Sequence, residues 1–515
     1  MRVIVVGGGH NGLVAACYLA RAGLDVLVLE QSGRLGGGSR TEELVPGHRF
    51  DTHSVAHNLV HATGILDDLR LDEVGLRYAE MDPFSIAVFA GGPIVRFHRS
   101  VAATVESIAE VDRAEARRYR AWMHDTMPVV DLFRAGLDAG APPGRALRSL
   151  PRRAMAGTRA LRRNGGPLGL ARLLVSPYGR VLRERLGSDL VRGPVAAFAA
   201  HASASPDDGG SATFALWQAF YHQVGQWHAL GGSQALVDAL AARLAASGGA
   251  WRCAAPVVRI LRRDDTVTGV RLESGEHLTA DAVVTAIDPR VALLELLDPP
   301  LDGPEAARLR AAHHGNAVQM LVLLATTALP AYPGARPGDH HGLQSYVDSL
   351  DGLAAGFAAA ADRRLPEDPV PTYTFTPSAL DPTLAPPGHH TVYLACPTAP
   401  ARVRGGWDAA AEGFAERMID TVEARAPGFR ASIVARAIRT PETMARDLRW
   451  PGAHPMHLDV GLDQLGPLRP TPGLGHHRTP VRGLVVSGAG TAPVGGISGA
   501  PGRAAARVLL RQLRR

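Results

Sequence analysis

The sequence predicts an α/β fold built on a parallel sheet, because its first forty residues contain a complete strand, turn, helix and strand. A short apolar strand, Arg2 to Val6, runs directly into Gly7-Gly8-Gly9-His10-Asn11-Gly12, and a helical stretch follows from Leu13 to Ala22. A second strand, Val26 to Leu29, ends at Glu30. A glycine-rich turn alone is weak evidence, but in this context it indicates a βαβ unit that binds a dinucleotide.

The glycines and the acid of this unit each have a predicted role. Gly7 allows the tight turn, Gly9 lets the backbone approach a pyrophosphate, and Gly12 lets the helix pack closely on the strand. The diphosphate is expected at the helix N-terminus, where unpaired N–H groups and the helix dipole favour negative charge. Glu30, eighteen residues after Gly12, is placed to accept hydrogen bonds from a ribose diol.

Two further glycine-rich loops indicate which dinucleotide binds. The first, Gln31 to Glu43, directly follows the ribose-binding acid, as expected where an extended FAD needs more backbone donors. The second, Gly488 to Gly502, follows a short strand at Leu484 to Ser487 and precedes a helix from Arg503 to Leu513. This repeats the strand, glycine loop and helix start of the first motif, and we expect it to face the flavin ring and the ribityl chain.

Together these segments resemble the phytoene desaturase-like FAD oxidoreductases. The likeness rests on Gly9 to Ala16, Gly36 to Glu43 and Gly488 to Gly502, with further matches between Gly231 and Ala286. It implies a Rossmann-type FAD-binding domain with an inserted α+β substrate domain, and a strand at Val258 whose backbone contacts the adenine.

The resemblance and the motifs together give a set of predicted FAD-binding residues. These are Gly7, Gly9, His10, Asn11, Gly12, Glu30, Gln31, Gly37, Gly38, Ser39, Arg40, Val258, Gly490, Thr491, Gly496, Ile497 and Ser498. One position departs from the family, because many relatives have Arg directly after the paired glycines, where this chain has Gly38. Whether Arg40 makes the phosphate contact instead is left open by the sequence.

The predicted domains are interleaved along the 515 residues. Such a length suits two domains. We expect the FAD-binding domain to comprise residues 1–75, 220–290 and 441–515. The substrate domain is expected to comprise residues 76–219, which are helix-rich and basic, and residues 291–440, which mix helices and strands.

The composition excludes several chemistries. All 55 basic residues are arginine, so neither a Schiff-base lysine nor a phosphate-binding P-loop lysine is present. Cys17, Cys253 and Cys396 are widely separated and lie in apolar stretches, which favours packing residues over a disulfide or metal site. No apolar run approaches the ~20 residues that span a bilayer. We therefore expect a cytoplasmic protein without a metal.

The segment 144–192 is strongly basic, with twelve arginines against Glu184 and Asp189, and with apolar residues between them. Nothing else in the chain resembles a nucleic-acid-binding module, so a nucleic-acid partner is not expected. Two interpretations remain open, of which the first is favoured. The segment is either a solvated helical surface that covers the substrate cavity, or an amphipathic patch that rests on anionic lipid at the membrane periphery.

The candidate proton carriers are histidines, of which the chain has 21. His53, His57 and His61 are spaced by four and would share one face of a helix if this stretch were helical. They are the predicted catalytic residues, against the alternative that their rings only hydrogen-bond the FAD-binding domain. A second candidate wall contains His201, His222 and His228 among aromatic residues.

We expect an FAD-dependent enzyme that moves hydride between flavin N5 and a carbon of an apolar polyunsaturated molecule. Natural-product tailoring is favoured, either reduction with cyclisation of a polyene, as in tetramate macrolactam biosynthesis, or desaturation. NADPH is the candidate reductant for the first direction. The alternatives are a carotenoid-type desaturase at the membrane surface and a lipid-binding carrier of the GDP-dissociation-inhibitor type. An amine oxidase is disfavoured by the absence of lysine, and the sequence leaves the oligomeric state open.

Overall fold

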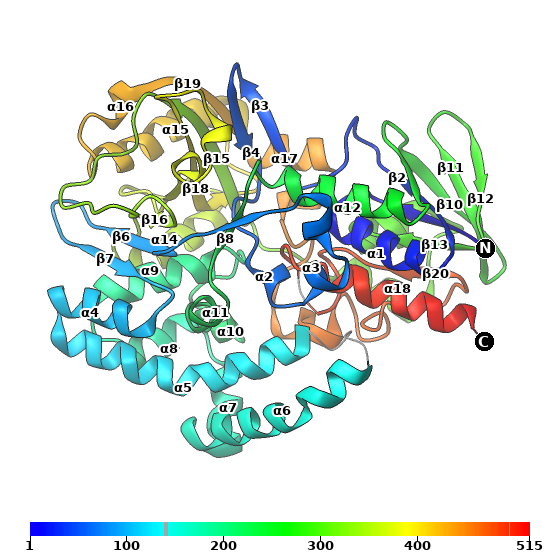
Figure 1. The fold of residues 1–515 in the computed structure, drawn as a ribbon, viewed down its shortest axis with the longest axis horizontal. Helices are drawn as coiled ribbons and strands as arrows, with labels where there is room; N and C mark the ends of the chain where they lie inside the picture. The colour runs from blue at the N-terminus through cyan, green and yellow to red at the C-terminus, as the bar shows by residue number, and fades with distance from the viewer. Residues whose placement is uncertain (138–142, 494, 515) are drawn as a thin grey trace.

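A five-stranded parallel sheet carries the predicted dinucleotide-binding unit. The computed structural model describes residues 1–137, 143–493 and 495–514. The strand order is β20-β13-β1-β2-β9. The bounds are β1 Arg2–Val6, β2 Asp25–Leu29, β9 Ala250–Arg252, β13 Ala282–Thr285 and β20 Leu484–Val486. Strands from the beginning, the middle and the end of the chain thus lie side by side, at the right of Figure 1.

Two layers cover the two faces of this sheet because β1 alternates its side chains. Val3 and Val5 pack in one buried cluster with three helices, and Ile4 and Val6 pack in another with a second sheet. The helices are α1 His10–Arg21, α12 Gln234–Ala246 and α18 Ala500–Leu513. The second sheet has the order β12-β11-β10-β14, with β10 Val257–Arg263, β11 Thr266–Leu272, β12 His277–Thr279 and β14 Leu297–Asp298.

A seven-stranded mixed sheet forms the other half of the molecule, at the upper left of Figure 1. Its order is β19-β15-β18-β17-β16-β6-β7. The bounds are β6 Ser85–Val88, β7 Ile94–Phe97, β15 Ala317–Thr326, β16 Leu343–Ser345, β17 Tyr373–Phe375, β18 His390–Pro400 and β19 Ile433–Arg439. On one face Met320, Val322 and Leu324 pack with α15 Trp407–Glu423, and the other face turns toward a large helical layer.

This helical layer is formed by residues 101–224 and runs along the bottom of Figure 1. Its helices are α4 Val101–Val111, α5 Arg113–Leu137, α6 Pro143–Arg163, α7 Gly166–Val175, α8 Tyr178–Arg185, α9 Asp189–Ala200, α10 Ala212–Ala215 and α11 Trp217–Val224. Ser100 and Ser188 cap α4 and α9 by accepting hydrogen bonds from the first turn of each helix. The helical layer covers the face of the seven-stranded sheet that is opposite α15.

The predicted elements of the dinucleotide-binding unit are confirmed, with shifted ends. Helix α1 begins at His10 rather than Leu13, and α18 begins at Ala500 rather than Arg503. Helix α13 Gly303–Ala311 lies in the predicted mixed segment 291–440. The interleaved domain boundaries stay a prediction, although strands from residues 1–75, 220–290 and 441–515 meet in one parallel sheet.

A buried ionic network fixes the loop that follows β4 His48–Asp51. His228, in β8 Trp227–Ala229, lies 3.5 Å from the carboxylate of Asp381 and donates from Nδ1 to the carbonyl of Val55 at 3.2 Å. The Asp381 carboxylate also accepts the Gly231 amide at 2.6 Å. His228 and Asp381 are both almost fully buried, so this network joins three distant parts of the chain without solvent screening.

The pKa values of the two partners in this network are shifted in opposite directions. Burial opposes the charge on His228, but Asp381 and Asp51 raise the pKa of His228 above its ordinary value of 6.5. Burial also opposes the charge on Asp381, and the bonds from His228, Thr383 and Gly231 nevertheless hold the pKa of Asp381 below its ordinary value of 3.8. Stability from Asp381 is therefore present above about pH 4 and lost as the pH falls through the lowered pKa. Stability from His228 is full below pH 6.5 and lost as the pH rises through the raised pKa.

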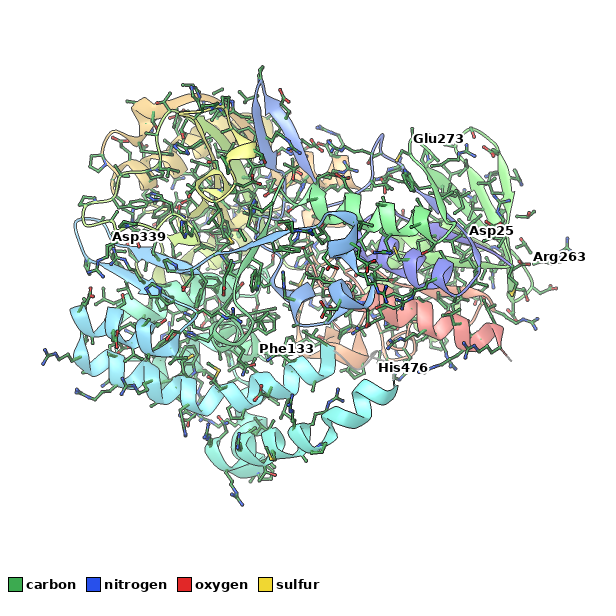
Figure 2. All side chains as sticks on the ribbon, viewed as in Figure 1. Asp25, Phe133, Arg263, Glu273, Asp339 and His476 are labelled. Atoms are coloured by element: carbon green, nitrogen blue, oxygen red, sulfur yellow. The ribbon has the colours of Figure 1, made fainter. Side chains whose placement is uncertain are left out.

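We expect His228→Gln to destabilise the protein by about 3 kcal/mol at pH 6, because it leaves the buried Asp381 carboxylate without its cation. The variant should also lose the part of the alkaline decline in stability that comes from deprotonation of His228. Thermal unfolding between pH 5 and 9 measures both effects, with the exposed His476, labelled in Figure 2, replaced by Gln as the matched control. Equal pH profiles for the wild type and His228→Gln would contradict the assignment.

Candidate active site

A single cavity of about 380 Å³ runs from the glycine turn of β1 to the helical layer. Its volume lies in the range of small-molecule sites. Twelve of the predicted site residues line it. They are Gly7, Gly9, His10, Asn11, Glu30, Gln31, Gly37, Gly38, Arg40, His53, Gly496 and Ile497. Residues from both ends of the chain therefore meet at one end of this cavity.

The end beside β1 suits a dinucleotide. Glu30 accepts the amide protons of Gly8 at 2.8 Å and of Ser32 at 2.9 Å, which fixes its carboxylate at the end of β2 with lone pairs left for ribose hydroxyls. A Cβ on Gly9 would approach nothing closer than 4.0 Å, so the backbone is open where a pyrophosphate would lie. At Gly12 a Cβ would instead collide with the carbonyl of Gly7, in agreement with the predicted close helix–strand packing.

Two buried polar atoms at this end have no partner within the described residues. They are Nε of Arg40 and Oδ1 of Asn11, and both side chains line the cavity. A buried donor or acceptor without a partner costs free energy, so its presence points to a ligand. The guanidinium of Arg40 lies 3.8 Å from the carboxylate of Glu30. Arg40 is therefore suited to the phosphate contact that the position of Gly38 left open, and the residues present fit FAD.

The C-terminal glycine loop closes the cavity through His10. His10 donates from Nε2 to the carbonyl of Gly496 at 3.1 Å, and burial lowers the pKa of His10 to about 4. The other predicted FAD-binding residues do not line the cavity. These are Gly12, Ser39, Val258, Gly490, Thr491 and Ser498. Val257 lines it in place of Val258, because successive side chains of β10 point to opposite faces.

The helix predicted to align His53, His57 and His61 is wrong. Helix α2 covers only Asn58–His61, and residues 53–57 are not helical. His57 is fully buried away from the cavity, with Nδ1 bonded to the hydroxyl of Tyr78 and Nε2 to that of Ser233. His61 stacks on Trp227 at 4.6 Å and also lies outside the cavity lining.

The carbonyl groups of this segment explain why it is not helical. The carbonyls of His53, Ser54 and Val55 accept hydrogen bonds from the side chains of Tyr393, Ser233 and His228 respectively. These oxygens would otherwise accept the amides of a helical turn. Tertiary contacts therefore outweigh the local spacing, and they bring His53 alone of the three predicted catalytic residues to the cavity.

His53 presents a neutral imidazole to the cavity. Its Nδ1 lies 2.9 Å from the hydroxyl of Thr52, and that hydroxyl donates to the carbonyl of Arg40. Nε2 is buried and has no hydrogen-bond partner among the described residues, so it is available to a group in the cavity. Burial, reinforced by Arg439 and Arg40, lowers the pKa of His53 to about 3.

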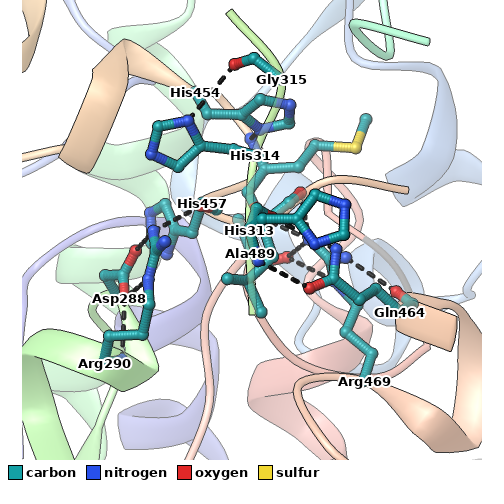
Figure 3. Close-up of polar contacts among 12 residues, drawn as sticks. Asp288, Arg290, His313, His314, Gly315, His454, His457, Gln464, Arg469 and Ala489 are labelled. Atoms are coloured by element: carbon teal, nitrogen blue, oxygen red, sulfur yellow. Dashed lines mark hydrogen bonds and ion pairs between the residues drawn. The ribbon is translucent and has the colours of Figure 1, made fainter. Parts of the chain in front are cut away.

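The sequence did not reveal the segment 449–457, which forms part of the cavity lining through Trp450, Met456 and His457. Two arginines, the partly buried Arg290 and the fully buried Arg469, hold it, as Figure 3 shows. Arg290, paired with Asp288 at 2.7 Å, donates to the carbonyl of His457 at 2.8 Å. Arg469 donates to the carbonyl of Met456 within the segment, to that of Leu458 just after it, and to that of Ala489. These contacts join residues far apart in sequence, and no local motif marks them.

The far end of the cavity is lined by what we call the aromatic wall. It comprises Phe198, Trp217, Tyr221, Tyr373, Phe375 and Tyr393. These rings come from α9, α11, β17 and β18, and neighbouring pairs lie 4.7 to 6.5 Å apart between centroids. His201 lies among them, so part of the second wall predicted from the sequence is confirmed. His222 and His228 are instead buried outside the cavity lining.

We expect Glu30→Ala to weaken FAD binding about 10- to 100-fold, since hydrogen bonds to a carboxylate contribute about 1.5–3 kcal/mol. Titration of the apoprotein with FAD, followed near ~450 nm, the oxidised-flavin band, measures the change. The matched control is Glu273→Ala, because Glu273, labelled in Figure 2, is exposed and does not line the cavity. Unchanged affinity in Glu30→Ala would contradict the assignment.

None of the helices in the described residues is both long enough and apolar enough to span a membrane. Within the same residues, no group of three or more His, Cys, Asp or Glu side chains is arranged to hold a metal ion.

Comparison with known proteins identifies the family. A family model described as flavin containing amine oxidoreductase matches residues 12–509. The pyridine nucleotide-disulfide oxidoreductase domain-containing protein 2 of Mus musculus is 33% identical, over 99% of this chain and 93% of the mouse protein. A lycopene-forming phytoene desaturase of Paracoccus sp. is 26% identical, over 99% of this chain and 97% of the desaturase. The crystal structure of an oxidoreductase from Methanosarcina mazei has the same fold, with a TM-score of 0.67, 16% identity and coverage of 99% and 100% of the two chains. With the glycine turns, Glu30 and the cavity that they border, these matches establish that the chain belongs to the flavin containing amine oxidoreductase family.

Proposed function

We propose that this FAD-dependent oxidoreductase exchanges hydride with a carbon atom of an apolar, polyunsaturated small molecule in natural-product tailoring. Hydride transfer to the substrate would give reduction with cyclisation of a polyene, as in tetramate macrolactam biosynthesis. Hydride transfer from the substrate would give desaturation. The single observation that carries the proposal is the continuity of the cavity. Its lining includes the FAD-binding glycines and the aromatic wall, so an apolar substrate can reach the cofactor without crossing solvent.

In this chemistry the protein must orient the substrate, exclude water from it and transfer a proton. A bound FAD supplies a group that accepts or donates hydride. The aromatic wall offers flat apolar surfaces that suit conjugated double bonds. Trp450 packs against His53 at 5.5 Å between ring centroids and limits the access of water to it. With its pKa lowered to about 3, His53 accepts a hydrogen bond or a proton in transit but does not retain a proton at neutral pH.

Membership of an oxidoreductase family supports an enzyme over a lipid-binding carrier. The second candidate function is a carotenoid-type desaturase at the membrane surface. The phytoene desaturase likeness favours it, because it extends over nearly the whole of both chains. Acting on CH–CH bonds is common to both candidates.

The direction of hydride transfer can be tested with reduced nicotinamides. Outside the predicted FAD motifs, the arginine that lines the cavity within the described residues is Arg449. One cation is a poor match for the pyrophosphate and 2′-phosphate of NADPH. We therefore expect a yellow protein whose absorbance near ~450 nm, the oxidised-flavin band, is not rapidly bleached by NADPH or NADH without oxygen.

Rapid bleaching would instead assign the reductive direction, with NADPH or NADH as the donor. Persistence of the band would assign desaturation with another electron acceptor. A colourless protein that FAD does not reconstitute would refute the proposed function.

We also propose that α6 and α7 rest on anionic lipid. Among the described side chains, Met155 and Val175 are each 53% exposed and Leu168 is 85% exposed. Exposed arginines surround them, at positions 152, 159, 162 and 172. These two helices form the lower edge of the molecule in Figures 1 and 2, where their side chains extend away from the rest of the protein. Apolar side chains among cations match the interface of a membrane with negative headgroups.

We expect the protein to sediment with vesicles of phosphatidylglycerol and phosphatidylcholine, and much less with phosphatidylcholine alone. Leu168→Ser should weaken this binding about tenfold or more, because insertion of a leucine side chain contributes about 1.5–3 kcal/mol. The matched control is Val434→Ser, since Val434 is 54% exposed on β19. Equal sedimentation with both lipid compositions, or equal loss in both variants, would contradict the proposal.

A further inference from the structure

His201 presents an unused hydrogen-bond acceptor at the substrate end of the cavity. It follows directly after α9, and its Nδ1 lies 2.8 Å from the carbonyl of Ala197, one turn earlier. A carbonyl oxygen only accepts, so Nδ1 carries the ring proton. Nε2 is then a lone-pair acceptor on the side of the ring that points away from the helix.

No partner satisfies this nitrogen. Nε2 of His201 is buried and has no hydrogen-bond partner among the described residues, although the ring lines the cavity. Burial lowers the pKa of His201 to about 4, so protonation at neutral pH does not remove the lone pair. A buried acceptor without a donor destabilises the protein, and the donor is therefore expected from whatever fills the cavity.

The surroundings hold the imidazole in place. The ring of Tyr373 lies 4.3 Å from that of His201 between centroids, and Phe198 stacks on it at 5.9 Å. Tyr373 and Tyr393 lie 6.5 Å apart, and Tyr393 donates to the carbonyl of His53. One row of packed rings therefore links His201 to the backbone of His53 along the cavity.

We propose that His201 determines substrate specificity by accepting, through Nε2, a hydrogen bond from a hydroxyl or N–H group of the substrate. The inference rests on the proposed function and narrows its substrate class to unsaturated or aromatic molecules that carry such a donor. A pure hydrocarbon leaves the His201 acceptor unpaired and is discriminated against. A molecule that pairs with it gains both affinity and a fixed orientation in the cavity.

A matched pair of probes tests the donor requirement. In 2-methoxynaphthalene a methyl group replaces the hydroxyl proton of 2-naphthol, which removes the donor, and both molecules suit an aromatic site of this size. We expect the FAD-loaded protein to bind 2-naphthol about tenfold more tightly, the discrimination given by one satisfied buried hydrogen bond. Fluorescence titration measures both dissociation constants.

His201→Phe keeps an aromatic ring and removes the acceptor, so the affinity ratio of the two probes should fall to about one. The absorbance of bound FAD shows that this variant is folded. His476→Phe, at an exposed position, is the matched control and should keep the wild-type ratio.

Equal affinities in the wild type, a ratio that persists in His201→Phe, or no binding of either probe would overturn the inference. All three outcomes leave the proposed function intact if FAD is bound. A protein that takes up no FAD would refute the proposed function, and this inference with it.

Discussion

The site depends on the buried pairing of His228 with Asp381. The histidine holds the carbonyl of Val55, and the carboxylate holds the amide of Gly231 beside α12. Asp51, at the end of β4, contributes to the same network by accepting the hydroxyl of Thr41 and the amide of Ser233. Charges without water interact strongly, so the loop that carries His53 has little freedom to move relative to the glycine turns. The shape of the cavity is thereby tied to ionic contacts that themselves touch neither cofactor nor substrate.

The fold class was predictable from the sequence because its signals are local. The βαβ unit requires a strand, a turn and a helix in immediate succession, and residues 2–30 contain all three. The predicted Rossmann-type sheet with a second α+β part is confirmed by the structure and by the family. The likeness to phytoene desaturases is confirmed at the level of homologues, and the natural-product branch stays a proposal.

The spacing of the three histidines did not predict where they lie, because distant groups compete with local ones. The spacing of His53, His57 and His61 is helical, yet side chains from Tyr393, Ser233 and His228 occupy the carbonyls that a helix needs. Likewise, Arg290 and Arg469, which are distant in the sequence, bind carbonyls of segment 449–457, which lines the cavity. A periodic spacing indicates the conformation that a segment favours from its own residues. It carries no information on which donors the rest of the chain brings to that segment.

The position of β20 in the sheet has a consequence for biosynthesis. This strand pairs with β13, which lies beside β1, so one sheet combines strands that are far apart in the sequence. Contacts between such distant segments form slowly because loop closure costs entropy. During translation, the first glycine turn is therefore made long before the glycine loop after β20 can close over it. The predicted FAD site is accordingly complete only after β20 and the loop that follows it have been made, and until then the apolar residues of β1 and α1 lack part of their final packing.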